Sequence, residues 1–280
     1  MTLTKTTILL GILITLSPLV TNAQQQPDPA VSRQMEENSP PHNPEESKPV
    51  PAWEVSGQLQ FLTEYVGSGG YHYSRGRPVV QGVVDVAHKS GFWGELWTSS
   101  VAEAGDDGGV SNTAGMEIDI FLGYDGKITE SISWFAIYGY YYFPKNTHEH
   151  SDQKGSQDLE VGVKWKFLPS SSFLLSVTRD LDFDFDLIHG KKNGDNPGTT
   201  LSTALSHNFG DGWTARAGVS YYRPDGYDHT KGMKDKLRWY VRGKKTFGGG
   251  KYFVDVRYVD TDRNEDAYGP ALVGTFGINF

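Results

Sequence analysis

The sequence predicts an all-β fold: a transmembrane up-and-down antiparallel β-barrel of about 12 strands. Three observations support this prediction. From Trp53 to Phe280 apolar and polar residues alternate in short runs, each near the roughly 9–11 residues that a tilted membrane strand needs. The connections between the runs alternate between short and long. After residue 23 no apolar run approaches the roughly 20 residues that a spanning helix requires.

The alternation has the period of two that places successive side chains on opposite faces of a strand. In the run 116–124, Met116 and Ile120 share one face while Glu117 and Asp119 share the other. The sixth run (159–166), the tenth (236–244) and the eleventh (252–258) separate apolar from charged residues in the same way. We count 12 runs. Any total from roughly 10 to 14 strands remains compatible with the sequence, because the fifth run (132–143) and the seventh run (from Phe173) have ambiguous ends.

The connections predict which end of each strand faces which side of the membrane. The short turns are 88–91, 125–131, 168–171, 210–212 and 248–250. The long polar loops are 66–78, 102–115, 144–157, 186–198, 224–235 and 260–269. Short periplasmic turns and long outer loops are the habit of bacterial outer-membrane barrels. Both ends of the barrel chain are therefore expected in the periplasm.

Two segments precede the predicted barrel at 53–280. Residues 1–23 have a positive start, an apolar centre and small residues at the end, which is typical of a cleaved signal peptide. Residues 24–52 are polar and proline-rich without periodicity, and they predict a disordered periplasmic tether. The expected location is the outer membrane of a Gram-negative bacterium.

Composition excludes several classes of protein. The 280-residue chain contains no cysteine, so it has no disulfide framework and no thiolate metal site. Its formal net charge of -8 argues against nucleic-acid binding, which needs clustered basic residues. The mean hydropathy of -0.47 is low, but a membrane barrel exposes only alternate residues to lipid.

The second and third runs carry a family pattern. The matching residues are Gln81, Gly82, Asp85, Ala87, His88, Ser90, Gly91, Phe92, Trp93, Gly94 and Trp97. With the run 116–124 and the tyrosines before Pro144, the chain resembles the TorF-type porin family over residues 62–144. The resemblance implies an outer-membrane channel and no catalytic residues. One departure is that an Arg-Gly pair occurs only at Arg75-Gly76, later than in the family.

Charged residues segregate on the face predicted to line the lumen. The first four runs contribute Glu54, Glu64, Asp85, Glu95, Glu117 and Asp119. The ninth to eleventh runs contribute Arg216, Arg238, Arg242, Lys244 and Arg257. Arg or Lys facing lipid at the bilayer midplane would cost about 2–4 kcal/mol, which favours the inward assignment. We predict that these residues, apart from the terminal Glu54, set the selectivity of the lumen.

The predicted function is passive diffusion of small hydrophilic solutes through a lumen with opposed acidic and basic arcs. A lumen closed by interior salt bridges is the alternative. A non-conducting structural or adhesion barrel acting through its loops is a further one. Expected partners are outer-membrane lipid and lipopolysaccharide, small polar solutes, and the barrel-assembly machinery through the strand ending at Phe280. No cofactor or metal is expected.

Other candidate sites are less well supported. Ser206-His207-Asn208 is the only triplet that suggests an outer-membrane hydrolase, but adjacent strand residues face opposite sides. His207 is interpreted as an interface residue. His148, His150 and Asp152 lie in a predicted loop, as ordinary solvated side chains do. The acidic stretch 180–186 lacks the order of a calcium loop. The tyrosines of the run 132–143 are interpreted as an interfacial girdle.

Overall fold

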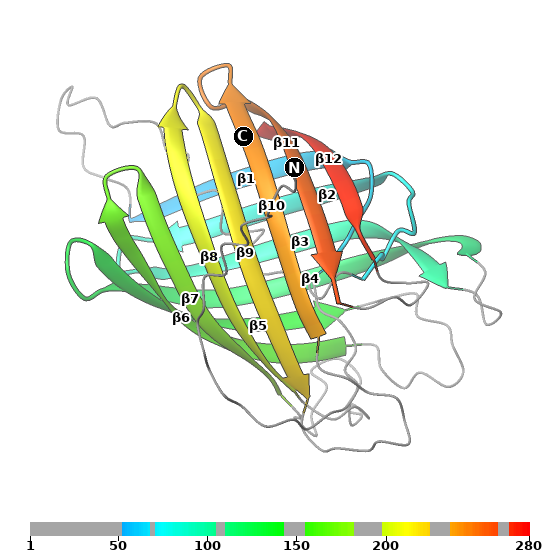
Figure 1. Cartoon of the computed structure of the whole chain (residues 1–280), viewed down its shortest axis with the longest axis horizontal. Helices are drawn as coiled ribbons and strands as arrows, with labels where there is room; N and C mark the ends of the chain where they lie inside the picture. The colour runs from blue at the N-terminus through cyan, green and yellow to red at the C-terminus, as the bar shows by residue number, and fades with distance from the viewer. Residues whose placement is uncertain are drawn as a thin grey trace, which may run out of the picture.

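Twelve antiparallel strands close into one barrel in the computed structural model (Figure 1). The structure describes residues 52–67, 71–104, 110–142, 155–181, 198–224, 236–262 and 269–280. The strands are β1 (Trp53–Leu62), β2 (Val79–His88), β3 (Phe92–Ala104), β4 (Val110–Lys127), β5 (Ile132–Tyr142), β6 (Gly155–Leu168), β7 (Ser171–Asp180), β8 (Gly198–Gly210), β9 (Trp213–Pro224), β10 (Lys236–Phe247), β11 (Tyr252–Thr261) and β12 (Ala271–Asn279).

The predicted fold class and strand number are confirmed. Each strand pairs with its neighbours in the chain, and β1 pairs with β12 to close the ring. Within the described part of the chain, no helix is long and apolar enough to cross a membrane. The predicted signal peptide and tether lie outside the described residues.

Short turns join the strands at one rim, as the sequence predicts. Gly91 and Gly212 lie in two of these turns with φ values of 100° and 77°. A Cβ on Gly91 would lie 2.3 Å from the carbonyl oxygen of Asp125, and one on Gly212 would lie 2.2 Å from that of Thr246. Each turn therefore packs against the next hairpin in a way that only glycine permits.

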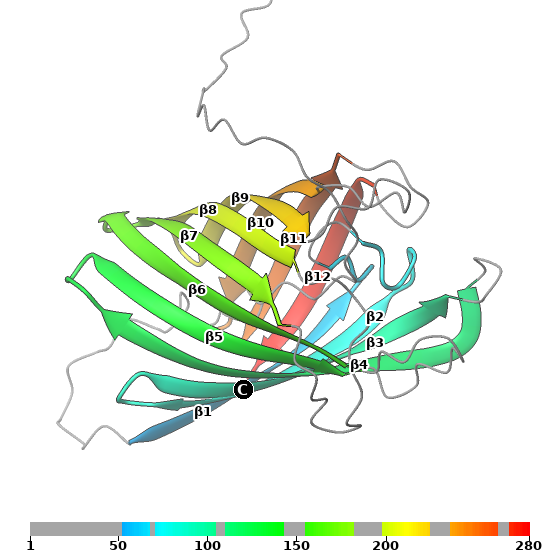
Figure 2. The same cartoon turned by 90° about the horizontal axis from the view of Figure 1, so that it is seen from below.

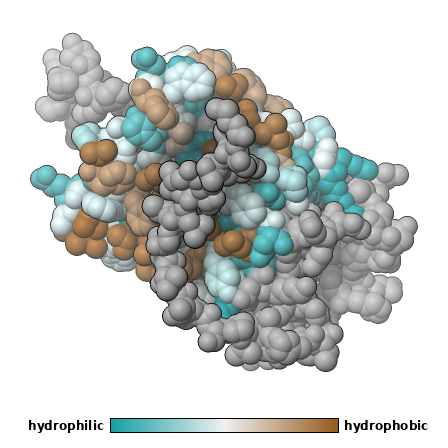
Figure 3. Space-filling view, viewed as in Figure 1, coloured by the Kyte–Doolittle hydropathy of each residue, from teal (hydrophilic) through white to brown (hydrophobic). Residues whose placement is uncertain are grey.

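The two faces of the wall separate as the period of two requires. Met116 and Ile120 are 42% and 43% exposed, while Glu117 and Asp119 between them are fully buried. The predicted faces of the sixth and eleventh runs are confirmed in the same way, with Val161 and Val256 exposed and Glu160 and Asp255 buried. Figure 3 shows hydrophobic side chains spread over the visible strand wall.

The β3–β4 hairpin is longer than predicted. The sequence places a loop at 102–115, but strand pairing continues through Ala102 and Ala114 as far as Ala104 and Val110. This hairpin extends beyond its neighbours in Figure 2. The segment is rich in Ala and Gly, so it carries no hydrophobic alternation. Backbone pairing does not need that alternation, and the loop prediction was wrong for this reason.

Glycines in the wall make room for aromatic rings from the neighbouring strand. Phe253 on β11 is paired directly with Gly277 on β12, and the ring lies where a Cβ on Gly277 would be, only 2.0 Å away. Tyr240 lies over Gly218 in the same manner. Such rings cover backbone that glycine leaves bare, and they help fix the register of the strands.

We expect Gly277→Ala to lower the free energy of unfolding by about 1–3 kcal/mol, because the added methyl group would displace the buried ring of Phe253. The measurement is the urea midpoint of the refolded barrel in detergent micelles, followed by tryptophan fluorescence. Gly243→Ala is the matched control, since no atom lies within 4 Å of its added Cβ. Equal midpoints for the two variants would contradict the packing argument.

Candidate functional site

Acidic residues line one side of the barrel interior. Glu95 on β3 and Glu117 and Asp119 on β4 are 5%, 0% and 0% exposed. Asp85 on β2 is half-buried. Asp158 and Glu160 on β6 are also buried and extend this acidic arc further than the sequence predicted.

Basic residues line the opposite side. Arg238 and Lys244 on β10 and Arg257 on β11 are buried, while Arg216 on β9 and Arg242 on β10 are half-buried. In the closed order of strands, β4 and β10 are six positions apart in either direction. The structure therefore places the acidic and basic arcs on facing walls. Glu54, in contrast, is exposed near the beginning of β1.

The basic residues have partners close at hand. Arg242 forms an ion pair with Asp255 on the adjacent strand. Arg257 donates from Nη2 to the carbonyl oxygen of Val66 over 2.9 Å. The Nζ of Lys244 lies 4.2 Å from the centroid of the Phe253 ring.

Two of the acidic residues are in the opposite condition. Both carboxylate oxygens of Asp119 are buried without a hydrogen-bond partner among the described residues, and those of Glu117 have only the Tyr65 hydroxyl within reach. Neither acid forms an ion pair with a described basic residue.

The chain after β1 folds into the barrel. This inner segment, residues 63–67 and 71–77, lies largely in the loop predicted at 66–78, and the structure places a connection between β1 and β2 there. The sequence did not predict that it folds inward. Glu64 was predicted on the first strand, but β1 ends at Leu62. The Glu64 carboxylate instead accepts hydrogen bonds from the backbone N–H of Gly76 over 2.6 Å and contacts Nδ1 of His72 at 2.7 Å.

Hydrophobic contacts hold the inner segment against the inner wall. Tyr65 and Val66 are 4% and 1% exposed, and both belong to a buried cluster with Trp97. The ring of Tyr65 stacks on that of Tyr73 at 4.7 Å and lies 5.6 Å from that of Trp97. Ser74 is buried too and accepts a hydrogen bond from the backbone of Tyr65. The segment therefore narrows the lumen at this level.

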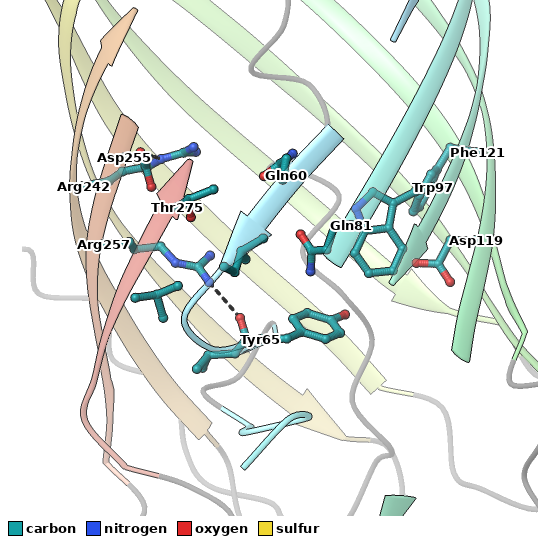
Figure 4. A pocket seen from close by; sticks show the side chains of 13 residues that line it. Gln60, Tyr65, Gln81, Trp97, Asp119, Phe121, Arg242, Asp255, Arg257 and Thr275 are labelled. Atoms are coloured by element: carbon teal, nitrogen blue, oxygen red, sulfur yellow. Dashed lines mark hydrogen bonds and ion pairs between the residues drawn. The ribbon is translucent and has the colours of Figure 1, made fainter. Parts of the chain in front are cut away.

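A cavity of about 560 Å³, part of it open to solvent, lies beside the inner segment. Figure 4 shows Asp119 and Trp97 on one side of it, Arg242 and Arg257 on the other, and Tyr65 at one end. Acidic, basic and aromatic groups thus meet around one space inside the barrel.

The other candidate sites have a plain structural account. His207 contacts the hydroxyl of Ser171 through Nδ1 at 2.7 Å and the ring of Phe209, and the sequence did not predict the Ser171 contact. Among the described residues no carboxylate is recorded beside His207 to orient it, as a triad requires. His148, His150, Asp152 and residues 182–186 of the acidic stretch lie outside the described ranges. Within those ranges no group of three or more histidine or acidic side chains is arranged to hold a metal ion.

The tyrosines of β5 do not all belong to a girdle. Tyr141 is 0% exposed and donates a hydrogen bond to Asp158 over 3.0 Å, so its assignment to the lipid interface was wrong. Aromatic residues occupy both faces of β5. The alternation of residue types therefore could not show which face of this strand points into the barrel.

The fold is that of outer-membrane channels. The chain matches the KdgM porin with a TM-score of 0.53 and 9% identity, over 80% of this chain and 98% of that one. It matches the NanC porin with 0.52 and 10%, over 81% and 99%. An outer-membrane channel from Pseudomonas putida F1 matches with 0.51 and 12%, over 86% and 100%.

The chain belongs to Gcw_chp, a family of bacterial proteins of unknown function, whose family model matches residues 46–277. No curated protein matches the chain in sequence. Family membership therefore establishes kinship without supplying an activity.

We expect Glu64→Gln to release the inner segment, because the loss of charge-assisted hydrogen bonds to Gly76 and His72 costs about 1.5–3 kcal/mol. Trypsin should then cleave the folded barrel after Arg75 roughly tenfold faster or more, since cleavage proceeds through local opening. Mass spectrometry of the time course identifies the cut. Glu54→Gln, an equal change at an exposed position, is the control. If both variants are cleaved at the rate of the wild type, Glu64 does not hold the segment.

Proposed function

We propose that the protein is an outer-membrane channel for passive diffusion of small hydrophilic solutes. The observation that carries this proposal is the closed barrel whose facing inner walls bear acidic and basic arcs around a cavity. Opposed charges at a narrow level of a lumen orient polar solutes and select among ions. The residues proposed to set selectivity are Glu64, Asp85, Glu95, Glu117, Asp119, Arg216, Arg238, Arg242, Lys244 and Arg257.

The proposed location is the bacterial outer membrane, with lipid and lipopolysaccharide around the barrel. A wall of exposed apolar residues over an interior of buried charges supports it, because only a lipid environment favours that arrangement. The resemblance to TorF-type porins and the fold of outer-membrane channels agree with it. Residues 1–23 would then direct export, residues 24–52 would lie in the periplasm, and the strand ending at Phe280 would engage the barrel-assembly machinery.

Single-channel recording of the refolded protein in a planar bilayer tests the proposal. We expect discrete conductance steps and a reversal potential under a salt gradient. Neutralising the basic wall with Arg216→Gln and Arg242→Gln should move the reversal potential toward that of the cation, because the acidic wall then dominates. Lys251→Gln, at an exposed turn, should leave it unchanged. A folded, inserted barrel without conductance would overturn the channel proposal.

A second candidate is a closed barrel that acts through its long connections. The inner segment supports this reading, because Tyr65, Val66 and Ser74 are buried within the barrel. The same recording separates the two, since a closed barrel gives no conductance. Deleting the connections at 143–154 or 225–235 would then abolish its activity while leaving the barrel folded.

A further inference from the structure

We propose that the acidic wall holds a binding site for an organic cation with N–H donors, such as a primary ammonium group, formed by Asp119 and Glu117 beside Tyr65 and Trp97. The inference deepens the proposed channel function by naming a class of solute, and it rests on that function for its biological meaning. It depends on four features of this wall.

The first feature is a pair of buried carboxylates that lack a basic partner. Glu117 and Asp119 are 0% exposed, and apart from the Tyr65 hydroxyl near Glu117 their four carboxylate oxygens have no hydrogen-bond partner among the described residues. A buried carboxylate that lacks a donor or a counter-charge is expensive. A cation that brings N–H donors of its own would complete both carboxylates and favour their ionised form.

The second feature is the sign of the surrounding charge. The charged groups that act on Asp119 are Glu117, Glu95 and Asp158, all of them acidic. Across the lumen, Arg242 is paired with Asp255, and Arg257 is bonded to the inner segment. These neighbours are all acidic, which favours a positively charged ligand over an anion beside Asp119.

The third feature comes from a different part of the chain. The hydroxyl group of Tyr65, in the inner segment, is buried and lies within hydrogen-bonding reach of the Glu117 carboxylate. Burial, and after it the negative charge of Glu117, raises the pKa of Tyr65 well above its usual value. Tyr65 therefore keeps its proton, and its oxygen can also accept a bond from an ammonium group.

The fourth feature is the aromatic and apolar lining, which distinguishes an organic cation from a metal ion. Tyr65, Trp97 and Phe121 border the same cavity as Asp119 (Figure 4). Aromatic faces attract ammonium groups, and Leu62 and Val273 offer apolar contact to a carbon chain. The described residues provide no group of three or more ligands for a metal ion.

Access to the site depends on the inner segment. Asp119 borders the cavity but has no exposed surface. Tyr65 lies at the end of the cavity that the inner segment forms (Figure 4). A solute that reaches both carboxylates must displace the Tyr65 ring from its contacts with Tyr73 and Trp97. The ring lies outside the strands, where such movement leaves the ladder of wall hydrogen bonds intact.

The experiment combines calorimetric titration of the detergent-folded protein with n-butylammonium chloride and block of single-channel current by the same compound. We expect binding and block in the wild type, and an affinity at least about tenfold lower in Asp119→Asn, the loss expected for a charge-assisted hydrogen bond. Glu117→Gln should weaken binding in the same direction. Both changes preserve shape and remove buried charge, so the barrel should still fold.

Asp125→Asn is the matched control, since it removes the same charge from the same face of β4 near the turn. It should leave the affinity unchanged. Conductance without butylammonium binding, or with equal affinity in Asp119→Asn, would overturn the site and leave the channel proposal standing. If the wild type binds butylammonium, Asp119→Asn abolishes that binding and the barrel does not conduct, the site is upheld and the channel proposal is overturned. If an equal concentration of potassium ions displaces butylammonium, the proposal of an organic cation is overturned in favour of an inorganic one.

Discussion

The pairing of β1 with β12 is the constraint on which the rest of the structure depends, because a strand wall in lipid must satisfy every backbone N–H and C=O within itself. The register of this seam covers only Gln58–Leu62, whereas β1 pairs with β2 along its whole length. Phe280 lengthens the seam. It exchanges backbone hydrogen bonds of 2.8 and 3.0 Å with Gly57, and its ring covers that glycine. The last residue of the chain therefore helps to close the ring.

Closure fixes both the charge arrangement and the inner segment. Once the ring is closed, the period of two sends Glu117 and Asp119 inward on β4 and sends Arg238 inward on the facing β10. The inner segment begins at the seam itself, where Thr63 donates from its backbone to Gly274 over 2.9 Å. From that point the chain turns into the lumen, and Arg257 on β11 anchors it there.

The sequence predicted the wall and its two faces because alternation is a local property that each strand displays by itself. It could not predict the inner segment, since Tyr65, His72 and Ser74 are ordinary loop residues and only the closed barrel gives them a surface to pack on. Nor could it pair Arg242 with Asp255, because that contact depends on the register between β10 and β11. The buried position of Tyr141 was hidden by aromatic residues on both faces of β5.

The partners of the interior charged residues distinguish a conducting lumen from a closed one better than the presence of those charges does. A plug of interior salt bridges would join the acidic arc to the basic arc across the lumen. Here the ion pair of Arg242 with Asp255 lies within the basic wall, and Arg257 is bonded to a backbone carbonyl. Glu117 lies near the Tyr65 hydroxyl, and both oxygens of Asp119 have no hydrogen-bond partner among the described residues. Buried acids that an entering cation could complete fit the proposed path for solutes.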